Sequence, residues 1–512
     1  MDFLILKIVF IGVVHSREGC VHKDYGNGGT VCVCDESHCD DLEAIHRTDK
    51  QVVTVYESSK SGHRLDKSVL NFGQKSVPKA NKSVTINVDK SQALYQAIIG
   101  FGGAFTDAAG INIKSLPQIL QKRLIEDYFG ETGIEYTLGR IPIGGSDFST
   151  HAYISVPIEI PLIKEAKAVS KHDIRLIASP WSAPAWMKNN SELNHGGFLI
   201  GQPGGKYYNA FANYLVKFLD AYKAQGIPVW GITIENEPEM AIYLGKIRNI
   251  KHPFNSMTFT PELQRDFLKL DLGPIMSAAG YGPNVTRVMV CDDQRPFISQ
   301  WAQVIYGDKE AAQYVSGMAF HWYLNNVSNA VNLDTVHNQD QSKFILSTEA
   351  CEMWMGKDQH VYLGSWQLFE KYAIDIIMDL NHWTGGWVDW NLALDTRGGP
   401  NWVNNFVDAP IIVNATAREY YKQPSFYSIA HFSKFLPPGA QRLNHTLAVD
   451  GPTDADTLLT TSFVRTDGGT VVVALNVGDT PIDVTINDVK QRQNITHLLS
   501  AHSMQTYIYF DN

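Results

Sequence analysis

The middle of the chain alternates short apolar runs with longer segments of helical periodicity. The apolar runs are rich in β-branched residues, as buried parallel strands are, and predict strands near residues 97–103, 135–143, 174–180, 230–235, 286–291, 316–322, 343–348 and 384–390. The amphipathic segments between them predict helices at 116–129, 214–225, 261–270 and 365–380. Eight strands that alternate with helices are typical of a (β/α)8 TIM barrel, so we expect an α/β fold.

Both ends of the chain instead alternate apolar and polar residues with a period of two. This pattern occupies residues 48–92 and returns at 457–511, where Gly, Asp and Pro turns separate the segments. Antiparallel strands at both ends predict one β-sandwich assembled from the two termini. A structural domain packed on the barrel is favoured over a carbohydrate-binding sandwich.

The first residues indicate a secreted protein. Residues 1–16 have an apolar core followed by small residues, which predicts a signal peptide cleaved after about Ser16. Asp2 and Lys7 are unusual in such a segment, and a buried N-terminal strand is the alternative.

Cysteine spacing agrees with secretion. A Gly- and Asp-rich stretch that is too short to form its own core contains Cys20, Cys32, Cys34 and Cys39. In a secreted chain this spacing predicts two disulfides in a small β module, although four cysteines permit three pairings. A zinc site is the alternative, but the nearby histidines lack finger spacing. Cys291 and Cys351 stand alone, and we expect them to be buried free thiols.

Size, composition and charge narrow the class of protein. The chain has 512 residues, of which 44% are hydrophobic and 19% charged, so it is long enough for a barrel with one or two smaller domains. A net charge of −10 argues against nucleic-acid binding and gives no basic face for anionic membranes. No later run approaches 18 apolar residues, and we expect any membrane contact to be peripheral.

Seven N-x-S/T sequons strengthen the secretory prediction. The candidates for glycosylation are Asn81, Asn284, Asn414, Asn444 and Asn494. Asn189 and Asn326 follow motifs of the predicted active face, where glycans would obstruct a cleft.

Two of the predicted strands end in glutamates. GITIENEP ends in Glu235, Asn236 and Glu237, and FILSTEA ends in Glu349. The carboxyl ends of barrel strands open onto the catalytic face, and a pair of carboxylates there is what glycoside hydrolysis needs. Glu237 and Glu349 are 112 residues apart, which leaves room for about three βα units and places them on the fourth and seventh strands. Glu235 is the rival to Glu237, since strand alternation puts both on one face.

Other strand ends supply groups suited to a sugar. Asp and Asn exchange hydrogen bonds with hydroxyls, and Trp stacks on the apolar face of a pyranose. The candidates are Asp147, Trp181, Asn236, His321, Tyr323, Trp390 and Asn405. Taken singly, each has a structural alternative, because a lone Trp is usually core and a lone His is usually structural. The segment GFGGAFTD does not fit a dinucleotide fingerprint, since its glycines lack the required spacing.

Several motifs in the same order point to one family. ITIENEP and LSTEAC, with GFGGAFTDAA, RIPIGGSDFS, ASPWSAPAWMK, FHWY, GWVDWNLAL and GGPNWVNNFVDAPIIV, resemble the acid β-glucosidases (glucosylceramidases) of glycoside hydrolase family 30. The resemblance covers nearly the whole chain from Cys20. It implies a retaining double displacement, with Glu237 as general acid/base and Glu349 as nucleophile, and without a metal or organic cofactor.

The resemblance also implies roles for the other residues. The disulfides would be Cys20–Cys32 and Cys34–Cys39. Asn236 would bond the sugar 2-hydroxyl, Asp147, Trp181 and Trp390 would hold the glucose ring, and His321 and Tyr323 would orient the carboxylates. Apolar loops with Phe254 and Tyr323 would meet the lipid of glucosylceramide. A lysosomal location reached through the secretory pathway, a saposin-type activator and anionic lipid are expected by the same resemblance.

The expected division of the chain is a small β module from 17–45 and 392–423, a β-sandwich from 46–94 and 440–512, and a barrel from 95–391 and 424–439. The insertion GGPNWVNNFVDAPIIV is expected to form a hairpin on the disulfide module. Two departures from the family stand out: the connection after Tyr153 is shorter by roughly twenty residues, which puts the barrel wall there in doubt, and the loop 245–253 is longer. A family relative acting on another β-glycan (a β-xylosidase or β-1,6-glucanase) and a non-enzymatic carbohydrate-binding protein are the alternatives.

Overall fold

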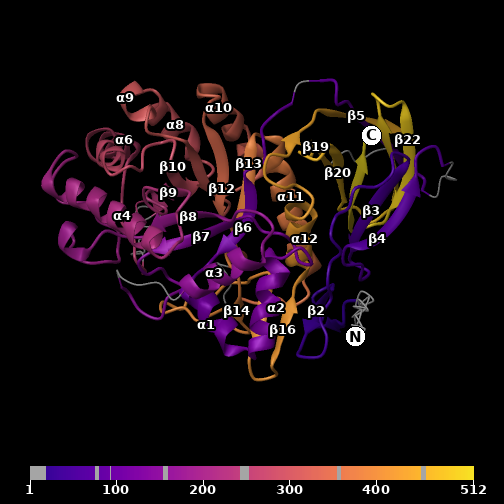
Figure 1. The fold of residues 1–512 in the computed structure, drawn as a ribbon, viewed down its shortest axis with the longest axis horizontal. Coiled ribbons are helices and arrows are strands. Elements are labelled where there is room, and N and C mark those ends of the chain that lie inside the picture. The colour runs from indigo at the N-terminus through magenta and orange to yellow at the C-terminus, as the bar shows by residue number, and fades with distance from the viewer. Residues whose placement is uncertain are drawn as a thin grey trace, which may run out of the picture.

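Eight parallel strands close into a barrel in the computed structural model (Figure 1). The structure describes residues 19–74, 80–92, 94–153, 159–240, 242, 253–353, 359–450 and 457–511, so the predicted signal peptide and most of the loop 245–253 lie outside the described residues. The barrel strands, in chain order, are β6 (Gly100–Ala104), β7 (Leu138–Ile143), β8 (Arg175–Pro180), β9 (Gly231–Thr233), β10 (Arg287–Gln294), β11 (Gly317–His321), β12 (Phe344–Glu349) and β13 (Thr384–Asn391). The prediction of eight strands and a TIM barrel is confirmed, and β13 pairs with β6 to close the circle.

Helices surround the barrel on its outside. They are α1 (Asp107–Ser115), α2 (Gln118–Phe129), α3 (Ile160–Val169), α4 (Lys206–Ala224), α6 (Pro261–Phe267), α7 (Gly273–Ala278), α8 (Ile298–Tyr306), α9 (Lys309–Ala312), α10 (Val331–Gln339), α11 (Trp366–Asn381) and α12 (Pro424–Ser433). A π-helical segment, Leu268–Leu272, joins α6 to α7, and short 3-10 turns lie at Ala185–Met187 and Val327–Asn329.

Side chains from six strands fill the barrel interior. They form one buried cluster of Leu138, Ile177, Met289, Ala319, Leu346 and Val388. The glycines of GFGGAFTD have a packing reason, because a Cβ on Gly102 would lie 2.1 Å from the Leu138 carbonyl oxygen of the neighbouring strand. Glycine therefore lets β6 and β7 approach closely, which gives these glycines a structural role in the barrel.

The two ends of the chain meet in one β-sandwich, as predicted. Its larger sheet has the order β17-β19-β20-β23-β3-β4 and its smaller sheet the order β18-β5-β21-β22. The strands from the N-terminal part are β3 (Val52–Ser59), β4 (Asp66–Asn71) and β5 (Ser83–Val88). Those from the C-terminal part are β17 (Gln441–Arg442), β18 (His445–Asp450), β19 (Leu458–Val464), β20 (Gly469–Asn476), β21 (Ile482–Asp488), β22 (Gln493–Leu499) and β23 (Ser503–Phe510). In Figure 1 the indigo and yellow strands of this sandwich lie beside the barrel, next to α11 and α12.

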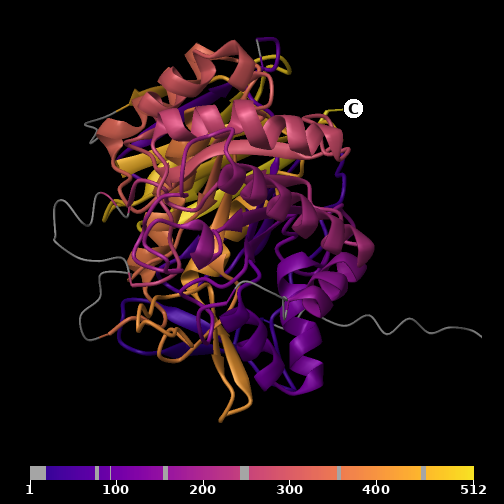
Figure 2. The ribbon, with the colours of Figure 1, turned by 90° about the vertical axis from the view of Figure 1, so that its left-hand side faces the viewer.

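A third sheet joins the first described residues to the insertion after β13. Its order is β1-β2-β16-β15-β14, with bounds β1 (His22–Asp24), β2 (Thr30–Cys34), β14 (Leu394–Asp395), β15 (Ile411–Asn414) and β16 (Glu419–Lys422). The hairpin in the insertion is formed by β15 and β16 and projects from the body of the molecule in Figure 2. The predicted hairpin segment was therefore placed too early, because residues 398–410 have no strand and run as a loop.

The cysteine predictions are confirmed. Cys20 pairs with Cys32, Cys34 pairs with Cys39, and both Cys291 and Cys351 are free and buried. Burial raises the pKa of both free thiols well above the ordinary value, so they remain protonated.

The shortened connection after Tyr153 leaves the barrel wall intact. β7 and β8 pair in parallel over six residues, from Leu138–Arg175 to Ile143–Pro180, and α3 begins at Ile160. Residues 154–158 lie outside the described residues. Within the described part of the chain, no helix is both long and apolar enough to cross a membrane. The domain boundaries by residue number, and glycosylation of any sequon, stay predictions.

Candidate active site

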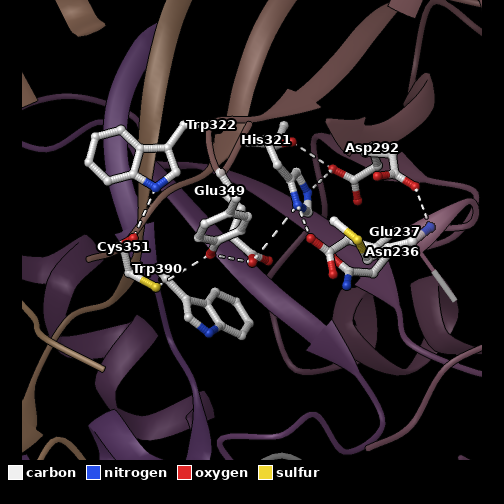
Figure 3. Close-up of polar contacts among 12 residues, drawn as sticks. Asn236, Glu237, Asp292, His321, Trp322, Glu349, Cys351 and Trp390 are labelled. Atoms are coloured by element: carbon white, nitrogen blue, oxygen red, sulfur yellow. Dashed lines mark hydrogen bonds and ion pairs between the residues drawn. The ribbon is translucent and has the colours of Figure 1, made fainter. Parts of the chain in front are cut away.

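The two predicted glutamates come together at the carboxyl end of the barrel. Glu349 is the last residue of β12, the seventh strand, and Glu237 follows β9, the fourth. One carboxylate oxygen of each glutamate and one nitrogen of His321 all lie within 4.8 Å of one another (Figure 3). The chain thus brings two acidic groups from distant segments to one place.

Local backbone conformation separates Glu237 from Glu235. Glu237 has a left-handed backbone with φ of 49°, and its N–H donates to the Asp292 carbonyl at 2.9 Å. Strand alternation has therefore ended, and Glu237 faces the cluster. Glu235 is completely buried, and burial raises its pKa well above the ordinary value despite the nearby Lys188 ammonium and the Met257 backbone amide. Strand periodicity left these two glutamates equivalent, whereas the turn makes their surroundings different.

Glu349 is held by donors on both oxygens. Arg140 on β7 donates through Nη1 to Oε2, and the Tyr323 hydroxyl donates to Oε1 at 2.7 Å. The guanidinium of Arg140 is fully buried and lies 4.9 Å from the ring centre of Trp181 and 5.4 Å from that of Trp390. Donors on both oxygens fix the orientation of the Glu349 carboxyl group.

Asp292 is the centre of a group of buried polar side chains next to the two glutamates. Its carboxylate accepts hydrogen bonds from Arg140 Nη2 at 2.9 Å, Thr233 at 2.7 Å and Thr348 at 2.6 Å. Burial alone would raise the pKa of Asp292, but the charges of Arg140 and His321 outweigh burial and hold it well below the usual range. Asp292 is thus a permanent buried anion between two cations.

His321 lies between Asp292 and the two glutamates. Its Nε2 lies 3.1 Å from Asp292 Oδ1, and its Nδ1 lies 3.1 Å from Glu237 Oε1 and 3.9 Å from Glu349 Oε1. Burial would lower the pKa of His321, but Glu349, Asp292 and Glu237 together raise it to about 10. The imidazole is therefore doubly protonated and donates to Asp292 on one side and to Glu237 on the other. Glu237, His321 and Glu349 are also close enough to one another to bind a metal ion.

The residues predicted to hold a sugar surround this cluster. Asn236 accepts from Arg140 Nη2 at 2.7 Å, and Asp147 accepts from Asn405 at 2.9 Å. Burial, with added repulsion from Glu349 and Glu237, raises the pKa of Asp147 to about 7. The last members form an aromatic wall, in which the Trp181 and Trp390 rings stack 5.2 Å apart and Phe254 packs against the same apolar cluster.

Five polar residues of the site were not predicted: Arg140, Thr233, Asp292, Gln294 and Thr348. Arg140 is a charged residue inside the apolar run LGRIPI, and a charge there is a signal of a buried ion pair. Asp292 and Gln294 belong to the run DDQR at the end of the fifth predicted strand, and Glu237 and Glu349 also lie at ends of predicted strands. The position of these two residues at a strand end could therefore have identified Asp292 and Gln294.

Comparisons with known proteins agree with this geometry. Residues 98–156 and 155–436 match the glycosyl hydrolase family 30 TIM-barrel domain, and residues 439–507 match the family 30 beta sandwich domain. The barrel match is interrupted at the short connection that follows Tyr153.

Among similar proteins, "Putative glucosylceramidase 4" of Caenorhabditis elegans is 40% identical over 96% of this chain and 94% of its own length. "Lysosomal acid glucosylceramidase" of Mus musculus is 38% identical over 97% of this chain and 96% of its own length. Among solved structures, the endo-beta1,6-glucanase BT3312 superposes with a TM-score of 0.76 at 26% identity, covering 90% of this chain and 100% of that one. With both domains matched and similarity extending over nearly its whole length, the chain belongs to glycosyl hydrolase family 30.

Proposed function

We propose that the protein is a retaining β-glucosidase that hydrolyses glucosylceramide to glucose and ceramide. The observation that carries the chemistry is the approach of Glu237 and Glu349 to within 4.8 Å. Retaining glycosidases hold their two carboxyl groups about 5–5.5 Å apart, whereas inverting enzymes need about 6.5–9.5 Å to admit a water molecule. The substrate is supported by two relatives named glucosylceramidases, at 40% and 38% identity, compared with 26% for a β-1,6-glucanase.

In the first step, a carboxylate oxygen of Glu349 bonds to the anomeric carbon while the glycosidic C–O bond breaks. Glu237 transfers its proton to the departing oxygen, which leaves as ceramide. Arg140 and Tyr323 orient Glu349 for this attack, since each donates to one of its oxygens. The products of the step are a glucosyl–Glu349 ester and ionised Glu237.

In the second step, Glu237 takes a proton from water as the water oxygen bonds to the anomeric carbon. The ester bond to Glu349 breaks, and the nucleophile returns as a carboxylate. Two displacements at one carbon restore the starting configuration, so glucose is released as the β-anomer.

The surrounding side chains suit the binding of one glucose. Asn236 is assigned to the 2-hydroxyl, Asp147 with Asn405 to other hydroxyls, and Trp181 with Trp390 to the wall of the glucose site. Asn236 and Asp147 are already oriented by Arg140 and Asn405, which reduces the ordering that binding would require. Phe254 and Tyr323 are assigned to the lipid side of the opening.

A glycolipid substrate requires contact with a membrane surface. We assign the protein to the lysosome, reached through the secretory pathway, where it would contact anionic lipid peripherally and act with a saposin-type activator. The two disulfides are consistent with folding in an oxidising compartment.

The catalytic assignment is tested by trapping the ester. A 2-deoxy-2-fluoro-β-glucosyl fluoride should inactivate the enzyme, and peptide mass spectrometry should locate one added sugar on Glu349. Glu349→Gln should form no adduct and no product, while Glu370→Gln on α11 is a matched control that should do both. NMR of the first glucose released should show the β-anomer. An adduct on another residue, or α-glucose, contradicts the mechanism.

The substrate is tested by a panel. Glucosylceramide, an aryl β-xyloside and gentio-oligosaccharides should be compared at acidic and neutral pH, with and without vesicles that contain anionic lipid. We expect glucosylceramide to give the highest kcat/KM and anionic vesicles to raise it. Preference for a xyloside or for gentio-oligosaccharides would assign the enzyme to another β-glycan.

A further inference from the structure

Gln294 contacts the proposed acid/base directly. It is the last residue of β10, has no exposed surface, and donates from Nε2 to Glu237 Oε1 at 2.8 Å. His321 Nδ1 lies 3.1 Å from the same oxygen. Two N–H groups therefore converge on Oε1 of Glu237.

The other end of the Gln294 amide has no partner. Within the described part of the chain its Oε1 is buried and accepts no hydrogen bond. An unpaired buried carbonyl is unfavourable for folding, so a polar residue at this position needs a reason other than stability. The bond to Glu237 supplies that reason.

The backbone holds the two side chains in register. The N–H of Glu237 donates to the Asp292 carbonyl at 2.9 Å, and the N–H groups of Glu239 and Gln294 donate to the Asp293 carboxylate at 2.7 and 2.8 Å. The end of β10 is thus joined to the turn that carries Glu237. Gln294 meets Glu237 in a fixed geometry.

From this convergence we infer that Gln294 is a positioning residue which, with His321, reserves Oε1 of Glu237 as a hydrogen-bond acceptor and leaves Oε2 to carry the catalytic proton. A proton on Oε1 would face two N–H donors, which is repulsive, whereas a carbonyl-like Oε1 accepts from both. The same holds when Glu237 is ionised. The inference rests on the proposed function, since it assumes that Glu237 is the acid/base.

One oxygen would then act in both steps. Oε2 gives its proton to the leaving oxygen and later accepts a proton from water. The leaving oxygen and the water oxygen therefore approach the same side of the Glu237 carboxyl group, one after the other. Without Gln294 the carboxyl group could rotate, and the proton would be misplaced for part of the time. The loss should be greatest where the leaving group needs a proton.

The test compares two leaving groups in wild type and in Gln294→Met, which keeps the side-chain volume and removes the donor. Octyl β-glucoside needs protonation to leave, whereas 2,4-dinitrophenyl β-glucoside leaves without it. We expect kcat/KM for octyl β-glucoside to fall roughly 10–100-fold and that for the dinitrophenyl substrate to change less than about 3-fold. The Tm of Gln294→Met should stay close to that of wild type, because the loss of the bond to Glu237 is offset by the removal of an unpaired buried acceptor.

The matched control is Gln505→Met in β23 of the sandwich, which removes another buried glutamine. The Gln505 amide donates to Glu57 and to the Leu498 carbonyl at 2.8 and 2.9 Å. This variant should lower Tm and leave the ratio of the two substrates unchanged. A purely structural Gln294 would behave in the same way.

Gln294→Glu supplies a conditional donor. At acidic pH the protonated new carboxyl group can donate to Oε1 and preserve activity on octyl β-glucoside, whereas at higher pH it ionises and repels Glu237. Repulsion from this carboxylate raises the pKa of the neighbouring acid, so the alkaline limb of kcat/KM should move to higher pH than in wild type.

The outcomes distinguish the inference from the proposed function. Equal losses on both substrates in Gln294→Met, or a lower Tm with an unchanged substrate ratio, overturn the inference alone. A wild-type enzyme that hydrolyses neither glucoside contradicts the proposed function, and the role of Gln294 falls with it.

Discussion

Asp292 has no contact with solvent, yet it faces Arg140, Thr233, His321 and Thr348. Removing one partner from such a buried ionic cluster leaves the others uncompensated, at about 3–5 kcal/mol. We therefore expect Asp292→Asn to lower the free energy of unfolding by that amount, as measured by urea denaturation, and to abolish activity. Asp49→Asn at an exposed position should change the same free energy by less than about 0.5 kcal/mol. Equal stability of the two variants would contradict the view that Asp292 stabilises the buried ionic cluster.

The Tyr323 hydroxyl allows the contribution of one hydrogen bond to catalysis to be measured. It donates to Glu349 Oε1 at 2.7 Å, and a hydrogen bond to a charged group is worth about 1.5–3 kcal/mol. Tyr323→Phe should accordingly lower kcat/KM roughly 10–100-fold without changing the fold, as checked by circular dichroism. Tyr306 offers the matched control, because its buried hydroxyl has no hydrogen-bond partner in the described part of the chain. Tyr306→Phe should leave kcat/KM unchanged, and a similar loss in both variants would contradict this account.

Among single elements, β10 departs from regular strand geometry near its carboxyl end. Cys291 pairs with Ala319 and Asp293 with Phe320, so Asp292 is an extra, bulged residue. Cys291 and Asp292 both have left-handed backbones, with φ of 72° and 59°, and the Cys291 N–H donates to the Gln264 side chain at 3.1 Å. The bulge turns the strand end so that Asp292 and Gln294 reach the site from one element.

A β-branched residue tests this bulge. Valine is unfavourable at positive φ, so Cys291→Val should be less stable than Cys291→Ala by about 1–3 kcal/mol in denaturant unfolding. Its activity should fall as well, since the strain acts on the strand that carries Asp292 and Gln294. If valine is tolerated as well as alanine, the left-handed conformation at Cys291 is not required.

The eight strands and the two strand-end glutamates could be predicted because burial and barrel direction leave a local pattern in the sequence. Each strand is a short apolar run, and each catalytic candidate follows one. The bulge at Asp292 and the left-handed turn at Glu237 leave no such pattern, because they depend on contacts between β9 and β10. For the same reason strand periodicity could not separate Glu235 from Glu237. Arg140 was predicted only as part of an apolar strand, without a role in the site.

At the scale of the whole molecule, a buried polar network joins the disulfide module to the barrel. Lys422 on β16 lies 2.8 Å from Asp40 and 3.3 Å from Asp127 on α2, and Tyr420 donates to Asp127 at 2.5 Å. Period-two patterns at both ends predicted a sandwich from the two termini, since strand type is a local property. The contact between the disulfide module and α2 was not predictable, because Asp127 lies about 300 residues from its partners Tyr420 and Lys422 in the sequence.

Buried carboxyl groups make the stability of the whole chain depend on pH. Burial raises the pKa of Asp127 to about 6, of Asp147 and Asp408 to about 7, and of Asp293 to about 8. The unfolded chain loses these protons near pH 4, so the folded state holds extra protons above that pH, and stability falls as pH rises from about 4 to about 8. Two histidines act oppositely, because burial lowers the pKa of His431 to about 3 and of His445 to about 4. Their effect begins only below about pH 6.5.

Between pH 7.5 and 5.5 the four carboxyl groups change the stability more than the two histidines do. His321, whose pKa is raised to about 10, also favours stability at acidic pH, because its stabilising contribution is complete below about pH 6.5 and declines above it. We therefore expect a higher Tm at pH 5.5 than at pH 7.5, as calorimetry would measure. Asp408→Asn removes one titrating proton away from the proposed catalytic groups and should make this difference smaller. A Tm that rises toward neutral pH would show that these carboxyl groups are ionised in the folded protein. The expected direction is the one that suits an enzyme of an acidic compartment, so it links the burial of single carboxyl groups to the proposed lysosomal location.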